Sequence, residues 1–554
     1  MSAPTQTSPQ AAAATAPAGR RTFAGTATLT RFFLRRDRIR IPIWMVGVVG
    51  LVVGSAASLD ELLATEADRQ SRAALMGSPT MRAFNGPGYG LDDYTIGAML
   101  AHELLVLAAI AVAIMSLLLV LRHTRAEEEA GRAELLRSSI VGAHAVPAAA
   151  LLVAVVVNLA MGAVMAVALQ GAIEDLPALG SWMFGLSMAA VGIVFAAVAA
   201  LAAQVTEHSR GATGLASIAV GAAFALRAIG DMGGVGDRAL SWASPMGWAQ
   251  STRAFVDERW WPLLLCVALA VVLAAAALAL ADRRDVGAGL VRPRPGDPRA
   301  SEALVRPSGL AWRLHRGSIA AWSVGLAVLG AGFGGVLGEI EAFLDENPQM
   351  EEIIAAAEGA GLVESFLATV VVIVVLLAVG FAVSAAMRIR HEERRGRAEP
   401  LLATPLSRTR WARGHLVVVL AGSALVTLAG TVGAGVAAAL DQGDASLLGD
   451  LAAAGVAYVP AVWVTVGLVV VLFGVAPRAT GVAWVVLAHA VVVGLLGDVL
   501  DLPEAARALS PVHHVGALPA EPWSTAPPLA LAAVALVLVG VGLAALTRRD
   551  VGAG

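Results

Sequence analysis

Glutamate, glycine and arginine recur in the same order in two short segments of this chain. The tetrapeptide Gly-Arg-Ala-Glu stands at 131–134 and again at 396–399, an offset of 396 − 131 = 265. Further glutamates precede both copies, and long apolar stretches lie on either side of each segment. Carboxylates and guanidinium groups at helical spacing form ion pairs and present charge to other proteins. The two segments therefore predict binding rather than catalysis.

A helix over each segment would place Glu128 four residues before Arg132, and Glu393 four residues before Arg397, which is the favourable orientation for an ion pair. The flanking acids and a bare glycine would then share one face, which suits docking into a cleft of a partner. The alternative is a solvated helix whose ion pairs each contribute about 0.2 to 0.5 kcal/mol. Because the motif recurs, we favour docking, through Glu128, Glu129, Gly131, Arg132, Glu134, Glu392, Glu393, Gly396, Arg397 and Glu399.

The repetition extends along the whole chain. Arg-Arg-Asp-Val-Gly-Ala-Gly occurs at 283–289 and again at 548–554, and shorter matches run in the same order between the two halves. A sequence that repeats in this way folds as two similar units. The predicted organisation is a tail over 1–19, a first unit over 20–289, a Pro- and Arg-rich cytoplasmic linker over 290–309 and a second unit over 310–554.

Composition places both units in a lipid bilayer, since 58% of the 554 residues are hydrophobic and only 15% are charged. A spanning helix needs about 20 mainly apolar residues. In the first half such stretches cover 41–58, 98–121, 145–170, 179–204, 211–229 and 261–281. In the second half they cover 319–338, 366–387, 416–440, 451–475, 480–496 and 529–546. The predicted fold is an all-α polytopic membrane protein of about twelve spans, in two parallel-oriented six-helix repeats.

Arginine placement predicts the orientation of the spans. All 39 basic residues are Arg, and most of them fall in segments that are cytoplasmic if the N-terminus is inside. Short cytoplasmic loops gather basic residues, so both termini are expected in the cytoplasm. An even number of spans per half gives the two repeats the same orientation, and an axis along the membrane normal then relates them.

Taken together, the chain resembles the permease subunits of ABC-2 type exporters, and most closely the fused permeases of polyketide-antibiotic or multidrug exporters. The resemblance rests on the Glu-rich segments after the second span of each half, the repeated Arg-Arg-Asp-Val-Gly-Ala-Gly ends and the basic amphipathic stretch before the first span. It implies six spans per half, a bacterial plasma membrane, and a coupling helix after the second span that sits on an ATPase. The second copy departs from the first at Arg394, Arg395 and Pro400, which leaves open whether the two copies make equal contacts.

The energy source must lie outside this chain. A Walker A motif needs a lysine that reaches the terminal phosphates of ATP, and the sequence has no lysine. As an ABC permease the chain would need two copies of a separate ATPase subunit, which would bind ATP and Mg²⁺, while the chain itself binds no cofactor. We expect a transport subunit without enzymatic activity of its own and without a nucleic-acid partner. Its cargo would be a lipophilic or amphiphilic compound, such as an antibiotic, a drug or a lipid-like molecule.

Polar groups within the spans are few. Ionisable groups there are costly and indicate functional sites by default, so His102, Glu103 and Asn158 are weak candidates for a substrate path. Hydrogen bonds between helices explain them equally well. Arg227 lies four residues before Asp231, which favours a pair between them. The single Cys266 rules out an intramolecular disulfide and a cysteine metal cluster, and no metal site is expected.

Small residues recur at four-residue spacing in two spans. Gly50 and Gly54 lie in the first span, and Gly330 and Gly334 in the seventh. This spacing lets helices approach closely, so we expect the equivalent spans of the two halves to pack through these faces.

Two other classes of protein remain open. A proton-coupled secondary multidrug transporter also has six plus six spans, but its Gly-x-x-x-Asp-Arg-x-Gly-Arg signature is missing after the second span. A membrane-embedded glycosyltransferase would place acids in its first outer loop, where Asp60 and Asp92 lie. Such an enzyme has no reason to repeat itself, and no metal or nucleophile constellation accompanies these acids.

Overall fold

The computed structural model describes residues 22–132, 141–236, 238–285, 287–291, 298–338, 362–497 and 502–549. These residues form helices joined by turns, and none of them lies in a strand. Twelve of the helices are long and apolar enough to cross a membrane, which confirms the predicted all-α polytopic fold. The tail predicted over 1–19 lies outside the described residues.

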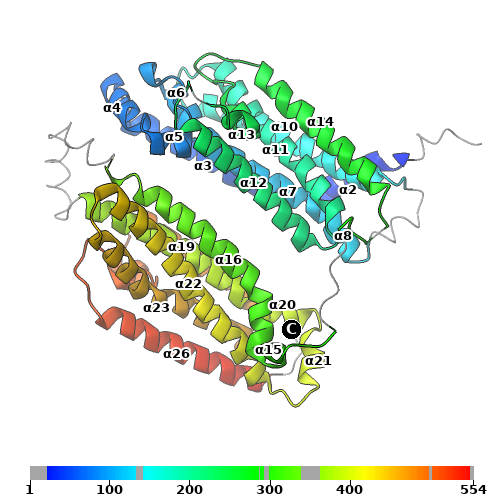
Figure 1. Ribbon diagram of the computed structural model, residues 1–554, viewed down its shortest axis with the longest axis vertical. Helices are drawn as coiled ribbons and strands as arrows, with labels where there is room; N and C mark the ends of the chain where they lie inside the picture. The colour runs from blue at the N-terminus through cyan, green and yellow to red at the C-terminus, as the bar shows by residue number, and fades with distance from the viewer. Residues whose placement is uncertain are drawn as a thin grey trace, which may run out of the picture. The chain divides into compact units, whose positions relative to one another are not determined.

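The chain divides into two compact units, Met1–Pro295 and Gly296–Gly554, and each holds six of the twelve helices. The first unit is a bundle in which α11 packs against α7, α10 and α14 (Figure 1). Its six long helices are α3 (Arg40–Leu62), α7 (Leu105–His123), α10 (Ala145–Ala172), α11 (Ala178–Val205), α12 (Ser209–Asp231) and α14 (Trp261–Ala281).

The second unit repeats this order of long helices. Here α22 packs against α16 and α23, and α23 packs against α26. The six are α16 (Pro307–Gly334), α19 (Leu362–Ala386), α22 (Arg408–Gln442), α23 (Ser446–Val475), α24 (Ala483–Leu496) and α26 (Ala526–Thr547).

Glycine sets the closest helix contacts within each unit. A Cβ added to Gly185 of α11 would lie 2.2 Å from the carbonyl oxygen of Gly162 in α10, and one added to Gly330 of α16 would lie 2.1 Å from that of Gly430 in α22. The glycine face of the seventh span therefore packs against α22 of its own unit, and packing between the equivalent spans of the two units stays a prediction. In the first span the added Cβ of Gly50 or Gly54 meets nothing within 4 Å, so this face stays open among the described residues.

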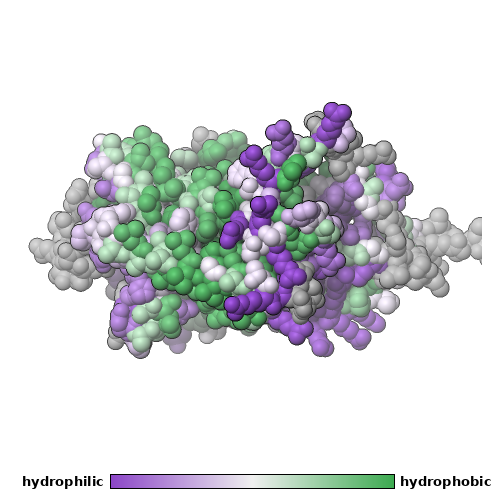
Figure 2. Space-filling model, turned by 90° about the horizontal axis from the view of Figure 1, so that it is seen from below, coloured by the Kyte–Doolittle hydropathy of each residue, from purple (hydrophilic) through white to green (hydrophobic). Residues whose placement is uncertain are grey.

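Several long helices bury little of their surface within the chain. In the most apolar stretch of α3 and in that of α14, only 17% of the residues are buried. Exposed Leu and Val side chains accordingly line both helices. Figure 2 views the molecule from the side on which α26 lies in Figure 1, and much of this face is hydrophobic too, with hydrophilic residues mainly toward its centre and right. Such an apolar surface suits contact with lipid.

The two units begin differently. In the first, the amphipathic helix α2 (Thr26–Arg36) is separated from α3 by a turn around Asp37. In the second, α16 runs without a break from Pro307, where proline fits the first helical position. Both α15 (Glu302–Val305) and the start of α16 fall in the stretch predicted to be linker.

Candidate functional site

The charged segment after the second span ends its helix at a glycine in both units. In the first unit α8 (Arg125–Glu129) is followed by Gly131 with φ +72°, and in the second α20 (Arg388–Arg394) is followed by Gly396 with φ +67°. A left-handed residue is the usual end of a helix, and glycine adopts it without strain. The continuous helix predicted through Gly-Arg-Ala-Glu is therefore wrong. Glu134 lies outside the described residues.

This turn changes the ion pair of the arginine that follows. Arg132 pairs with Glu127 at 2.7 Å, rather than with Glu128 as predicted. Arg397 likewise pairs with Glu392 at 3.4 Å, rather than with Glu393. The predicted partner was wrong by one residue because the chain folds back at the glycine instead of continuing as a helix.

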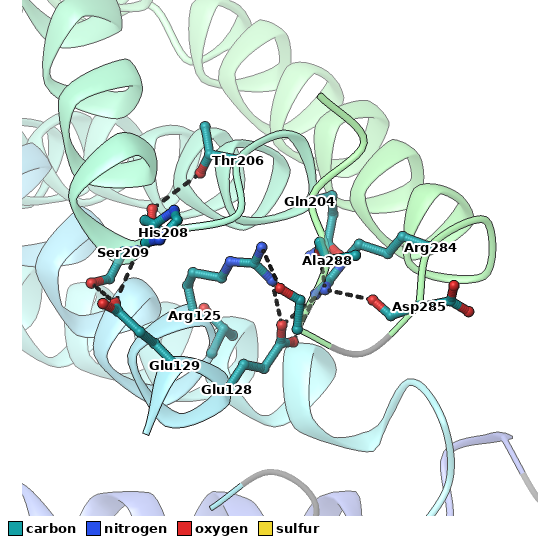
Figure 3. Close-up of polar contacts among 12 residues, drawn as sticks. Arg125, Glu128, Glu129, Gln204, Thr206, His208, Ser209, Arg284, Asp285 and Ala288 are labelled. Carbon is teal, nitrogen blue, oxygen red and sulfur yellow. Dashed lines mark hydrogen bonds and ion pairs between the residues drawn. The ribbon is translucent and has the colours of Figure 1, made fainter. Parts of the chain in front are cut away.

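Glu128 and Glu393, which do not pair with the arginine after the glycine, pair instead with an arginine at the end of the sixth span. Glu128 accepts hydrogen bonds from Arg284 at 2.7 and 2.8 Å (Figure 3), and Glu393 accepts one from Arg549 at 2.6 Å. Both arginines are the second residue of the repeated Arg-Arg-Asp-Val-Gly-Ala-Gly. We call these two ion pairs the latches. The two motifs that repeat in the sequence therefore meet in one site in each unit.

Both latches are largely shielded from solvent. The side chains of Glu128 and Glu393 are 12% and 8% exposed, and those of Arg284 and Arg549 are 7% and 13% exposed. Glu128 also accepts from Arg125 at 2.5 Å, and the Arg125 side chain is fully buried. Removing one member of a buried pair leaves the other charge uncompensated, so the latch fixes its two segments to one another.

Further contacts connect each latch to the fourth span. Arg284 donates to the side-chain oxygen of Gln204, near the end of α11, at 2.6 Å. Arg549 lies over the ring of Phe473 in α23, with its guanidinium carbon 4.7 Å from the ring centre. Each latch therefore joins the ends of the second, fourth and sixth spans of its unit.

In the first unit the latch segment also holds the helix that leads into the bundle. Arg36 of α2 pairs with Glu127 at 2.7 Å. The buried carboxylate of Asp37 lies 2.5 Å from His123 and 3.1 Å from Arg122. The residues that precede the first span thus contact the segment that follows the second.

The exposed part of the predicted docking set is smaller than the sequence suggested. In the first unit Glu129, Gly131 and Arg132 are exposed, and in the second Arg397 and Glu399 are exposed. Glu392 is buried beneath Arg397, while Gly396 and the two latch glutamates are at most partly exposed. A partner that docks here would meet the glycine turns and the arginines that follow them.

The sequence reasoning missed Arg284 and Arg549 as members of the site. Their signal was present, because the heptapeptide that contains them is the longest segment repeated without change. The sequence analysis used it as a mark of duplication and of family resemblance, and not as part of a site. A repeated charged residue next to a repeated residue of opposite charge would have suggested the pair.

Two of the predicted path residues belong to a network at the far end of α7 from the latch. His102 and Glu103 lie in the short helix α6 (Ile96–Glu103), before the second span, which begins at Leu105, so their predicted placement inside that span is wrong. The hydroxyl of Tyr94 contacts His102 Nδ1 at 3.0 Å and donates to Glu103 at 3.1 Å, while Arg72 pairs with Glu103 at 2.6 Å. Burial lowers the pKa of His102, and the hydrogen bond to Glu103 raises the pKa of Arg72. Their role in a path stays a prediction.

The third path residue, Asn158, is fully buried in α10. Its amide nitrogen donates to the Ser116 hydroxyl in α7 and to the Ala154 carbonyl, each at 2.8 Å. This geometry is that of a hydrogen bond between two helices.

Two further predictions can be compared with the structure. Arg227 and Asp231 form the predicted pair at 3.6 Å, and Arg238 joins it at 2.9 Å. Among the described residues, no group of three or more His, Cys, Asp and Glu side chains could hold a metal ion.

Twelve apolar helices in two units, each closed by the same charged latch, make up a duplicated polytopic membrane protein of the permease type. A family model described as "Multidrug efflux system permease Rv1217c, C-terminal domain" matches residues 27–280 and 304–546, one stretch in each unit. The multidrug efflux system permease protein Rv1217c of Mycobacterium tuberculosis (strain ATCC 25618 / H37Rv) is 41% identical over 545 residues, covering 97% of this chain and 98% of that protein. The chain therefore belongs to the Rv1217c-type multidrug efflux permease family, and its twelve apolar helices make it a multi-pass protein of the bacterial plasma membrane.

Proposed function

We propose that this chain is the transmembrane subunit of an ABC-2 type exporter, driven by a separate ATPase that docks on the glycine turns of both units. The observation that carries the proposal is the latch. It connects the segment after the second span to the end of the sixth span, in both units and through the same repeated residues. A displacement of α8 or α20 is thereby passed to α14 or α26 of the same unit.

The exposed turns suit a docking partner. Gly131 and Gly396 have nothing within 4 Å of where a Cβ would lie. Arg132 and Arg397 beside them are exposed and already tied to Glu127 and Glu392. A partner can therefore approach the backbone closely there, next to an oriented positive charge. The sequence has no lysine, which a P-loop needs, and this supports the proposal that ATP and Mg²⁺ bind to the partner rather than to this chain.

The proposed cargo is a lipophilic or amphiphilic compound. Supporting this, a cavity of about 380 Å³ lies in the first unit between α3, α7, α10 and α12. Ile41, Trp44, Met115 and Leu118 contribute apolar walls, and the arginines at its polar end are Arg40 and Arg122. Small-molecule sites are mostly apolar with a few convergent polar groups. The similarity to a multidrug efflux permease agrees with a drug-like cargo.

The test is drug efflux from cells that express the permease with whatever ATPase co-purifies with it. We expect efflux to stop when ATP is depleted while the proton gradient is kept, and the permease purified alone to hydrolyse no ATP. Efflux that continues without ATP but stops when the gradient collapses would establish a secondary transporter instead. Robust ATP hydrolysis by the isolated chain would overturn the proposal.

A further inference from the structure

We propose that the second unit carries a phosphate-binding cleft that takes the head group of an anionic phospholipid. The cleft has a volume of about 600 Å³. Four arginines and two glutamates line it, namely Arg390, Arg394, Arg478, Arg549, Glu393 and Glu399. They come from α20, from the short helix α21 (Ala398–Leu402), from the 3-10 helix η3 (Pro477–Val482) between α23 and α24, and from the residues just after α26.

Positive charge is in excess within the cleft. Glu393 is engaged with Arg549 at 2.6 Å in the latch. Arg390 donates to the hydroxyl of Thr480, which is a neutral partner. Arg394 and Arg478 are both exposed, and neither is within ion-pair distance of a carboxylate among the residues that the structure describes. Like charges held this close repel one another unless an anion lies between them.

The arginines of the cleft also include hydrogen-bond donors that have no acceptor among the described residues. The buried Nε atoms of Arg390 and Arg549 have no acceptor within the described part of the chain. Buried polar groups in native proteins normally have a partner. A guanidinium presents several N–H groups in a planar fork that matches the oxygens of a phosphate.

The corresponding region of the first unit is neutralised from within. Arg125 and Arg284, which correspond to Arg390 and Arg549, both pair with Glu128, at 2.5 and 2.7 Å. The position that corresponds to Arg394 is Glu129, which accepts hydrogen bonds from the backbone and side chain of Ser209 (Figure 3). Among the described residues, the arginines that carboxylates neutralise in the first unit therefore correspond to arginines that are only partly neutralised in the second, a difference that favours a binding site over a requirement of folding.

Depth identifies the source of the phosphate. The cleft begins immediately beyond the apolar ends of α19, α23 and α26, which stop at Ala386, Val475 and Thr547. The head groups of the adjacent leaflet lie at this level, and basic pockets at the ends of spans bind anionic head groups. The inference does not depend on which energy source drives the permease.

The test uses the full-length permease in detergent, with bound lipid counted by native mass spectrometry. We expect phosphatidylglycerol to stay bound in preference to phosphatidylcholine, and the double variant R394Q/R478Q to weaken that binding about tenfold or more, because two charge-assisted contacts are lost. Both side chains are exposed, so the variant should fold. The matched control is R410Q/R413Q, which removes two exposed arginines at the start of α22 and should bind as the wild type does.

A separate arm replaces the lipid with inorganic phosphate and follows the melting temperature. Phosphate that stabilises the wild type but not R394Q/R478Q, without selective lipid retention, would support the cleft and assign it to a soluble phosphate. Equal phosphatidylglycerol binding by the wild type and R394Q/R478Q would overturn the proposal. So would an equal loss in R410Q/R413Q, since the effect would then be one of net charge.

Discussion

At the scale of single residues, the polar groups of this permease are held in fixed pairs. Glu128 accepts from two arginines, Asp37 contacts His123 and Arg122, and Tyr94 bridges His102 and Glu103. Burial of such groups is costly unless each has its partner. Their stability therefore depends on keeping the charge state in which the pairs form.

His102 gives a pH dependence at the network around α6. Burial lowers its pKa below the ordinary value of 6.5, so the folded state binds fewer protons than the unfolded state as the pH falls below that value. Stability at this site is present above pH 6.5 and is lost as the pH falls through the lowered pKa. We expect lower protection factors, which are exchange rates corrected for the pH dependence of intrinsic exchange, in the segment from α4 (Glu66–Met76) to α6 at pH 5 than at pH 7.5.

The H102Q variant is the control for that measurement, because glutamine keeps a polar side chain that does not titrate. Its protection factors from α4 to α6 should change little over the same pH range. An equal pH response in the wild type and H102Q would assign the effect to another group.

At the scale of elements, the glycine that ends α8 and α20 decides where the charged side chains point. In the first unit it ends the helix and turns the chain, so that Arg132 pairs with Glu127. Glu128 then pairs with Arg284 in the latch. A helix that continued through this point would have paired Glu128 with Arg132 instead. The turn is thus a condition for the latch.

The variants G131A and G396A test this condition. Each glycine has a positive φ and open space around its Cβ position, so alanine adds backbone strain of about 1 to 2 kcal/mol and no clash. We expect a lower melting temperature and weaker stimulation of the partner ATPase. The matched control is G214A, inside α12 with the same open space, where alanine should stabilise by about 0.5 to 1 kcal/mol. A drop in G214A as large as in G131A would contradict this explanation.

The spans could be predicted from the sequence, because a run of about 20 apolar residues has few alternatives in a bilayer. The turn at Gly131 could not, because glycine is tolerated within helices and only the tertiary partner of Glu128 favours the break. The latch itself joins residues 156 positions apart, beyond the reach of local periodicity. Glycine spacing had the same limit: it marked Gly50 and Gly330 alike, and only Gly330 meets another helix within its unit.

At the scale of the whole molecule, duplication gave two compact units with separate hydrophobic cores. The latch is present in both units, but its surroundings differ. The first unit neutralises its arginines and has a separate α2, whereas the second leaves an arginine-lined cleft and begins with one continuous helix. The copies have kept their mechanical connection and diverged in the surface around it.

Because the two units have separate hydrophobic cores, we expect the losses of stability from one substitution in each unit to add. The E128Q and E393Q variants should each lower the free energy of unfolding by about 1.5 to 3 kcal/mol, the worth of a charge-assisted hydrogen bond. The double variant should lose the sum of the two within about 0.5 kcal/mol. Denaturant unfolding in mixed micelles measures all three, with E61Q, an exposed glutamate of α3, as the control. If the double variant had the same free energy of unfolding as the less stable of the two single variants, the latches would be coupled.

The sequence separation of the latch has a consequence for synthesis of the protein. Glu128 leaves the ribosome 156 residues before Arg284, and Glu393 precedes Arg549 by the same interval. During that interval the latch glutamate of each nascent bundle lacks its partner, Arg284 or Arg549. We therefore expect the inserted helices to be loosely joined until the sixth span has been inserted. The latch ion pair can form only after this last step. We therefore expect chains that stall earlier to be the preferred substrates of membrane proteases.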